Sequence, residues 1–147
     1  MYLACYVNFM ITITKTIEFD SAHRVKGHEG KCRHVHGHRY KLNITLTAES
    51  LDGIGRVIDF SEVKEIVKSY IDSTYDHNTI VFKEDSELLE RLQGMDRPLA
   101  IIPLNPTAEN LVVHFYNDLK VLMPSGIDIT KMELFETPTS SATLCIK

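Results

Sequence analysis

The sequence predicts an α+β fold in which an antiparallel sheet is covered on one face by helices. Segments near both ends of the chain alternate apolar and polar residues with a period of two, as strands do. Two segments between them repeat apolar residues with the spacing of an amphipathic helix. The strands come in pairs and do not alternate one by one with helices. The order strand–strand–helix–helix–strand–strand therefore favours antiparallel pairing.

The first pair of strands is rich in threonine and isoleucine. Residues 11–19, ITITKTIEF, alternate and predict one strand. Residues 20–35 contain glycines, histidines and charges, which predict a loop. Residues 36–48, HGHRYKLNITLTA, alternate again, so that Tyr40 and Leu42 fall on one face. We expect the two strands to form an antiparallel ribbon with a long connection.

The middle of the chain should contain the first long helix and two short elements. Asp59 stands three residues before Glu62, as in a capping box, and an apolar stripe follows. The stripe consists of Val63, Ile66, Val67, Tyr70 and Ile71. After this helix, residues 86–93 predict a short helix and residues 98–103 predict a short strand.

The second long helix should begin after Pro106, with Thr107 as its N-cap, and reach about residue 122. Residues 127–136 and 141–146 predict the final pair of strands. Because no repeat or linker interrupts this pattern, we interpret residues 1–147 as a single domain. Residues 1–10 are expected to be an N-terminal extension.

The composition favours a globular protein in a reducing compartment. Apolar residues make up 44% of the chain, which is enough for a hydrophobic core. The cysteines Cys5, Cys32 and Cys145 are an odd, sparse set, which argues against a disulfide scaffold. No apolar run approaches the roughly 20 residues that span a bilayer. We therefore expect a cytoplasmic protein without a membrane segment.

The formal net charge of −4 is unevenly distributed. The stretch from His23 to Lys41 carries six Lys or Arg residues and only one acidic residue, Glu29, whereas the remainder is strongly acidic. Nucleic acid needs an extended basic surface, so a short basic stretch on an acidic protein argues against that partner. It suits a small anionic ligand better.

Histidines are concentrated in the same stretch, and their spacing predicts a metal site. Side chains at i and i+2 of a strand point the same way, so His36 and His38 form a chelating pair. The third ligand can be His23, His28 or His34, and His23 is favoured because it lies just beyond the first strand. Imidazole ligands suit Zn²⁺, and three of them leave a position open, as in catalytic zinc sites.

Five motifs, in this order and spacing, resemble the family of 6-pyruvoyl-tetrahydropterin and 6-carboxytetrahydropterin synthases. They are FDSAH at 19–23, CRHVHGH at 32–38, DHN at 76–78, PTAEN at 106–110 and FET at 135–137. The resemblance covers nearly the whole chain from about residue 11. It implies the tunnelling fold, or T-fold, in which the sheets of a trimer close into a barrel and trimers stack into hexamers. We therefore expect a homo-oligomer.

The resemblance also implies roles for individual residues. The zinc ligands would be His23, His36 and His38, the catalytic residues would be Cys32, Asp76 and His77, and the pterin-binding residues would be Thr107, Glu109 and Glu136. In the family, the aspartate and histidine reach the cysteine from a neighbouring subunit. The segment between Asn78 and Pro106 is longer here than in compact members of the family.

The spacing C-x3-HGH resembles the carboxytetrahydropterin synthases of queuosine and 7-deazaguanine biosynthesis. The implied reaction converts 7,8-dihydroneopterin triphosphate to 6-carboxytetrahydropterin, with release of acetaldehyde and triphosphate. Three alternatives stay open. They are a 6-pyruvoyl-tetrahydropterin synthase, a member that cleaves the side chain to a 6-hydroxymethyl product, and an assembly protein that binds zinc and a pterin without turnover.

Overall fold

The structure is a computed structural model that describes residues 10–96 and 98–147. Its strands are β1 (Thr12–His23), β2 (His36–Ala48), β3 (Asn78–Phe82), β4 (Leu99–Ile102), β5 (Ile127–Thr137) and β6 (Ser140–Cys145). Its helices are α1 (Phe60–Thr74), α2 (Ser86–Leu92) and α3 (Ala108–Leu119), and a 3-10 turn, η1, spans Lys31–Arg33. Apart from Met10, the expected N-terminal extension lies outside the described residues.

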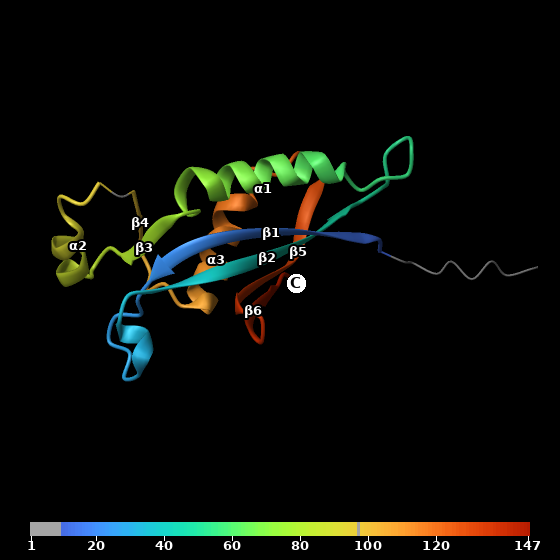
Figure 1. The fold of residues 1–147 in the computed structure, drawn as a ribbon. Helices are drawn as coiled ribbons and strands as arrows, with labels where there is room; N and C mark the ends of the chain where they lie inside the picture. Colours follow the sequence, from blue (N-terminus) through green and yellow to red (C-terminus); the bar gives the residue numbers. More distant parts are fainter. Residues whose placement is uncertain (1–9, 97) are drawn as a thin grey trace, which may run out of the picture.

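One curled six-stranded sheet, in the order β4-β3-β1-β2-β5-β6, organises the molecule (Figure 1). The four long strands pair antiparallel, as the sequence predicts. The two short strands are the exception, because β3 runs parallel to both β1 and β4. The prediction of a purely antiparallel sheet is therefore wrong for this end of the sheet. A strand–helix–strand crossover through α2 joins β3 to β4, and such crossovers connect parallel strands.

Helices α1 and α3 provide the apolar residues that cover one face of the sheet. The alternating residues Tyr40, Leu42, Ile44 and Leu46 of β2 are fully buried, and they face Val67 of α1 and its neighbours in one core cluster. Phe115 of α3 joins the same cluster. Each β2 residue that points the other way is at least partly exposed. The period-two pattern thus leaves the opposite face of the sheet open.

The helix starts follow from capping by side-chain oxygens. Thr107 accepts a hydrogen bond from the Asn110 N–H, as expected for the N-cap of α3. Asp59 caps α1, but its carboxylate accepts from the N–H of Ser61. The reciprocal capping box with Glu62 is not among the hydrogen bonds of the described residues. Arg56 also binds the carboxylate of Asp59, at 3.0 Å.

Strand β1 is longer than the sequence predicts, and this changes the position of His23. The predicted strand ended at residue 19, because polar residues follow. In the structure the strand continues through Ser21 to His23, which is paired directly with His36 of β2. The buried Ser21 hydroxyl donates to the Asn78 carbonyl, so the polar residue fits inside the sheet. His23 therefore lies within the strand and not beyond it.

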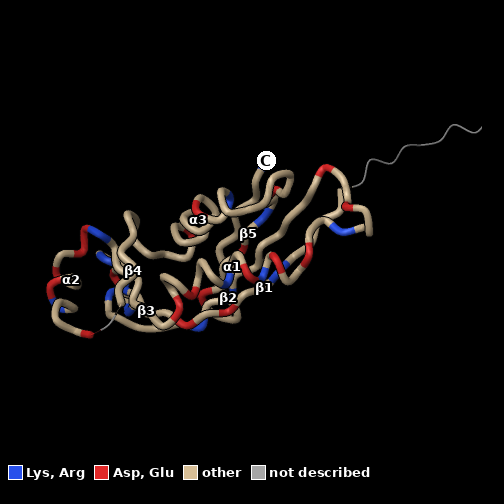
Figure 2. Tube along the Cα trace, turned by 90° about the horizontal axis from the view of Figure 1, so that it is seen from above, with Lys and Arg blue, Asp and Glu red and all other residues tan. Residues whose placement is uncertain are grey.

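The elements β3, α2 and β4 lie together at the end of β1 that carries His23. The turn after β2 lies at the opposite end of the sheet (Figure 1). Basic and acidic segments are interleaved along the trace (Figure 2). Among the described residues, no helix has the length and apolar character needed to cross a membrane.

Candidate functional site

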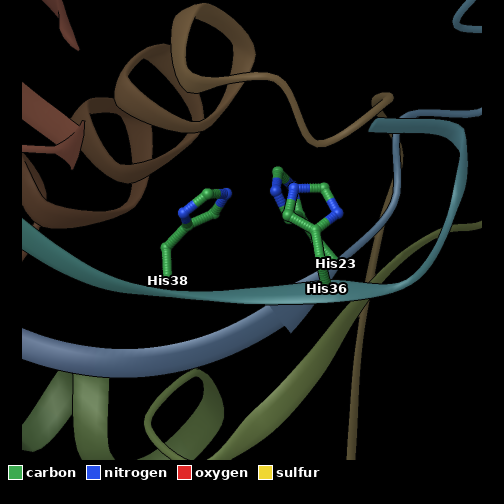
Figure 3. Close-up of side chains that lie close together, drawn as sticks. All are labelled: His23, His36 and His38. Atoms are coloured by element: carbon green, nitrogen blue, oxygen red, sulfur yellow. The ribbon is translucent and has the colours of Figure 1, made fainter. Parts of the chain in front are cut away.

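Three imidazole rings meet where β1 ends and β2 begins. His23, His36 and His38 each offer one nitrogen, and these nitrogens all lie within 4.8 Å of one another. The rings turn toward one another beside the segment that leads into α3 (Figure 3). The structure thus brings together the three residues that the sequence suggested. His34 is exposed and outside the group, because the turn η1 precedes it and ends the strand alternation.

Backbone carbonyls fix the orientation of two rings. The Nδ1 of His23 donates to the Pro106 carbonyl at 2.8 Å, and the Nδ1 of His36 donates to the His34 carbonyl at 2.8 Å. A carbonyl only accepts, so the proton of each neutral ring lies on Nδ1 and the lone pair lies on Nε2. Such outer hydrogen bonds typically orient histidine ligands toward a metal.

Burial keeps two of the three imidazoles, those of His23 and His38, in the neutral form at pH 7. Burial, together with the neighbouring His36 and His38, lowers the pKa of His23 to about 4, although the hydrogen bond to Pro106 opposes this. Burial likewise lowers the pKa of His38. The Nε2 atoms of His23 and His38 are buried and, among the described residues, have no hydrogen-bond partner. Neutral, unpartnered and convergent nitrogens are what a zinc ion requires.

Glu136 approaches the histidines from β5. Its Oε1 lies 3.4 Å from the Nε2 of His23 and 3.9 Å from the Nε2 of His38. Tyr40, beside it on β2, is fully buried, and its hydroxyl has no hydrogen-bond partner among the described residues. Burial and the negative charge of Glu136 raise the pKa of Tyr40, so its hydroxyl keeps its proton.

A cavity of about 310 Å³ is lined by most of the other predicted site residues, and Glu136 connects it to the three histidines. Cys32, Thr107, Glu109 and Glu136 line it together, although they come from η1, α3 and β5. Glu136 also lines a second cavity of about 390 Å³, together with His38. It therefore stands between the metal site and the cavity that holds the thiol.

The loop that carries Cys32 is closed by backbone hydrogen bonds. The Val25 N–H donates to the Cys32 carbonyl at 2.8 Å, which joins the two ends of the loop. His28, within the loop, accepts the Gly30 N–H on its Nδ1 at 2.8 Å and lines the cavity. A Cβ on Gly30 would lie 3.0 Å from the Cε1 of His28, so a glycine lets the ring lie this close.

Asp76 and His77 form a separate pair. Asp76 accepts the Asp20 N–H at 2.9 Å and lies 2.9 Å from the Nδ1 of His77. Burial alone would raise the pKa of Asp76, but these hydrogen bonds hold it below its ordinary value. His77 has a φ of 58° and a side chain that is 77% exposed.

This pair does not reach the cavity of its own chain. Strand alternation directs the Asp20 side chain away from the face that carries His23, and the Asp76–His77 pair lies beside the Asp20 carboxylate. Neither Asp76 nor His77 lines the cavity with Cys32. Within one described chain, the structure therefore leaves two of the predicted catalytic residues apart from the third.

The sequence of this chain is similar to proteins of known family. Residues 12–145 match the family described as 6-pyruvoyl tetrahydropterin synthase. The chain belongs to this family. It is 38% identical over 132 residues to the 6-carboxy-5,6,7,8-tetrahydropterin synthase of Rickettsia bellii, covering 88% of this chain and 96% of that protein. The protein of the same name from Haemophilus influenzae is 35% identical over 137 residues, covering 89% and 96%.

Solved structures of two other proteins have the same fold. An uncharacterized protein from Wolinella succinogenes matches with a TM-score of 0.82 and 23% identity, over 95% of this chain and 100% of that chain. The 6-pyruvoyl tetrahydropterin synthase of Caenorhabditis elegans matches with a TM-score of 0.69 and 24% identity, over 94% and 96%. The expected T-fold is thereby confirmed.

The basic stretch of this family member is less positive in the structure than in the sequence. Arg24 binds Asp85 through two nitrogens, and Arg39 binds Glu18 and Asp20. These acids come from other elements, and two of them precede the basic stretch on β1. A charge count along the sequence could not find these partners. If this stretch binds an anionic ligand, its other lysines and arginines would have to provide the positive charge.

Sequence reasoning missed several groups that shape the site. The Pro106 carbonyl that orients His23 carries no residue-specific signal, because any residue has a carbonyl. Strand alternation places Tyr40 in the core, but the sequence gives no sign that its buried hydroxyl lacks a hydrogen-bond partner among the described residues. Ser140 and Ser141, which also line the cavity, are the first two residues of β6 and resemble part of an ordinary hairpin in sequence.

Proposed function

We propose that this protein is a zinc-dependent 6-carboxytetrahydropterin synthase. It would convert 7,8-dihydroneopterin triphosphate and water to 6-carboxytetrahydropterin, acetaldehyde and triphosphate, as a step of queuosine or 7-deazaguanine biosynthesis. The observation that carries the proposal is the position of Glu136, which lines the cavity of Cys32 and lies 3.4 Å from His23. A single small molecule in that cavity can therefore meet the thiol, the carboxylates and the metal site.

The carboxylates are suited to hold the pterin ring. The amino-pyrimidine edge of a pterin presents neighbouring N–H donors, and a carboxylate accepts two such donors in one orientation. Glu136 and Glu109 both line the cavity, and Thr107 adds a hydroxyl. In this proposal Glu136 orients the ring so that its side chain extends toward Cys32 and the histidines.

Cys32 is proposed to remove a proton from a side-chain carbon. A thiolate is a competent base, and cationic neighbours favour its formation. Lys31 and Arg33 flank it in the sequence, and both are exposed. When bound by His23, His36 and His38, zinc supplies Lewis-acid stabilisation of negative charge on side-chain oxygens. The protein offers Cys32 as a free thiol, which fits the cytoplasm proposed for it.

Asp76 and His77 are proposed to complete the site of a neighbouring subunit. Asp76 holds the Nδ1 of His77, which leaves Nε2 free to exchange a proton with bound substrate. The exposure of His77 and its distance from the cavity of its own chain support a role at a subunit boundary. The proposed assembly is a trimer, or a hexamer of two trimers.

The sister activity is the second candidate. A 6-pyruvoyl-tetrahydropterin synthase would use the same thiol, carboxylates and metal, and the matching family is described by that name. The names of the relatives at 35–38% identity and the C-x3-HGH spacing favour the carboxy product.

Product identification tests the proposal. Zinc-loaded protein is incubated with 7,8-dihydroneopterin triphosphate, products are identified by mass, and acetaldehyde is assayed in parallel. The carboxy product with acetaldehyde is expected. A 6-pyruvoyl product without acetaldehyde would assign the sister activity. No turnover with zinc bound would favour a different pterin substrate or a binding protein without catalysis.

Two variants separate the thiol from the metal. Cys32→Ala should keep one zinc per chain and lose turnover, whereas His36→Ala should lose zinc. Cys145→Ala is the matched control, since Cys145 is exposed on β6 and does not line the cavity. If Cys32→Ala kept full turnover, Cys32 could not be the base.

A further inference from the structure

His28 is a candidate ligand-binding residue that neither the metal site nor the proposed chemistry uses. It lines the cavity that contains Cys32, Glu109 and Glu136. Its backbone N–H donates to the Val25 carbonyl at 3.2 Å, and its Nδ1 accepts the Gly30 N–H at 2.8 Å. The ring is thus anchored to the loop by hydrogen bonds at both its backbone and its side chain.

The hydrogen bond from Gly30 determines which tautomer the ring adopts. A nitrogen that accepts an N–H carries no proton, so the proton of His28 must lie on Nε2. A doubly protonated ring could not accept the Gly30 N–H at all. Within the described residues no protein group bonds to this Nε2. The ring therefore has a free N–H donor whose direction is fixed by the loop.

Among the described residues that line the cavity, no other side chain offers an N–H donor. Glu109 and Glu136 are acceptors, the thiol of Cys32 is a weak donor, and the hydroxyls of Thr107, Ser140 and Ser141 can donate or accept. Among the side chains that line this cavity in the described structure, His28 is the one with a nitrogen-bound proton. A ligand that presents N–H donors to the carboxylates would leave its oxygen atoms to be met by another group.

We propose that the Nε2–H of His28 donates a hydrogen bond to a side-chain oxygen of the bound pterin. This inference rests on the proposed function, because it assumes a pterin with a hydroxylated side chain. Glu136 would recognise the ring, and His28 would recognise the oxygens attached to it. The residue would thus discriminate between pterins that share a ring and differ in their side chain.

Two substitutions divide the imidazole into its two nitrogens. In His28→Asn, the amide oxygen takes the place of Nδ1 and can still accept the Gly30 N–H, but the distal donor is lost. In His28→Gln, the amide nitrogen can take the place of Nε2, but the acceptor for Gly30 is lost. Circular dichroism and zinc content should show that both variants fold and load metal as the wild type does.

The probes are neopterin, which carries a trihydroxypropyl side chain, and pterin, which has the same ring without it. Binding to the zinc-loaded, full-length protein is measured by titration of pterin fluorescence. The wild type should prefer neopterin. His28→Asn should lose about tenfold of this preference, as expected for one hydrogen bond, with little change in affinity for pterin itself. His28→Gln should retain most of it.

Each other outcome overturns the assignment. If His28→Asn keeps the full preference for neopterin, or if both variants lose it equally, the ring has only a structural role. If the wild type binds neither compound, the proposed substrate class fails, and the role of His28 fails with it. A ligand-free check is the ¹⁵N shifts of His28, because a protonated Nδ1 would contradict the tautomer on which the proposal depends.

Discussion

Several buried polar atoms of this protein have no partner, and they gather at one place. The Nε2 atoms of His23 and His38 and the hydroxyl of Tyr40 are buried without a hydrogen bond in the described structure. Such atoms destabilise a folded chain, because they lose their bonds to water and gain none in return. Such atoms are typical of places where a ligand or metal supplies the missing interaction. The residues that destabilise the fold here therefore mark the candidate site.

Tyr40→Phe should stabilise the metal-free protein. The ring of Tyr40 stacks on Phe19 with 5.2 Å between centroids, and phenylalanine would keep this contact while it removes the unpartnered hydroxyl. We expect a gain of about 1 kcal/mol in the free energy of unfolding, or roughly 3 °C in Tm. Thermal unfolding of the metal-free form checks this. A loss of stability would mean that the hydroxyl is hydrogen-bonded, for example to an ordered water.

The pH dependence of stability should reveal the buried His23. Its pKa is about 4 in the folded state and 6.5 in the unfolded chain, so between these values only the unfolded chain binds the proton. The free energy of unfolding is therefore highest above pH 6.5 and falls by up to about 3 kcal/mol as the pH is lowered toward 4. Urea unfolding of the metal-free protein at pH 7.5 and 5 measures this.

The control for that measurement is His23→Gln, which has no group that titrates in this range. Its stability should fall less between pH 7.5 and 5 than that of the wild type. Equal losses in the two proteins would assign the pH dependence to other histidines or to carboxylates.

Which site residues could be predicted depended on how far apart they lie in the sequence. His36 and His38 followed from strand alternation, because a period of two fixes their common face. His23 needed the pairing of two strands, so the sequence could only favour it over His28 and His34. The closeness of Glu136 to His23 depends on a strand more than 100 positions away, and no local pattern encodes that distance.

At the level of elements, an ion pair with a buried carboxylate ties β3, α2 and β4 to the end of β1, in addition to the pairing of β1 with β3. Asp85 is 1% exposed, caps α2 and binds Arg24 through two nitrogens, one at 2.7 Å. The sequence predicted α2 and β4, but it predicted neither β3 nor the parallel pairing of β3 with β4. Short apolar runs such as LAII do not reveal strand direction, which the α2 crossover sets here.

Asp85→Asn should destabilise the region formed by β3, α2 and β4. The substitution keeps the shape of the side chain but removes the charge that Arg24 faces, so we expect a loss of about 2 kcal/mol in stability. The rate of amide hydrogen exchange should increase most in α2. The matched control is Glu87→Gln, since Glu87 contacts the same guanidinium at 3.1 Å but is 60% exposed, and should cost at most about 0.5 kcal/mol. Equal effects would refute a special role for the buried pair.

For the whole molecule, two long strands of the described sheet, β1 and β6, have unpaired edges, in addition to the outer edge of the short strand β4. β1 is bonded to β3 only at residues 21–23, which leaves its earlier residues open, and β6 is bonded only to β5. The two edges run antiparallel to each other in direction, because three antiparallel pairings separate them. Copies of the chain can therefore join edge to edge and continue one sheet.

Thr143→Pro should break the proposed assembly without unfolding the subunit. Ile146 donates its N–H to Thr130 of β5, so alternation directs the N–H of Thr143 away from β5 and toward the open edge. Proline removes that donor. We expect a smaller mass by light scattering, one zinc per chain and loss of turnover, because Asp76 and His77 of a neighbour would be missing.

Thr143→Ala serves as the control, since it removes the side chain but keeps the N–H, and it should leave mass and turnover unchanged. An active Thr143→Pro monomer would show that one chain contains a complete site. An unchanged mass would show that assembly uses another edge.

The direct pairing of His23 with His36 makes metal affinity a measure of strand register. A slip of one residue between β1 and β2 would turn His23 to the open face and leave only the His36–His38 pair on the other. A chain with slipped strands, like an unfolded one, would offer two ligands where the correct hairpin offers three. A metal ion that binds three histidines more tightly than two would therefore shift the equilibrium toward chains with the correct strand register.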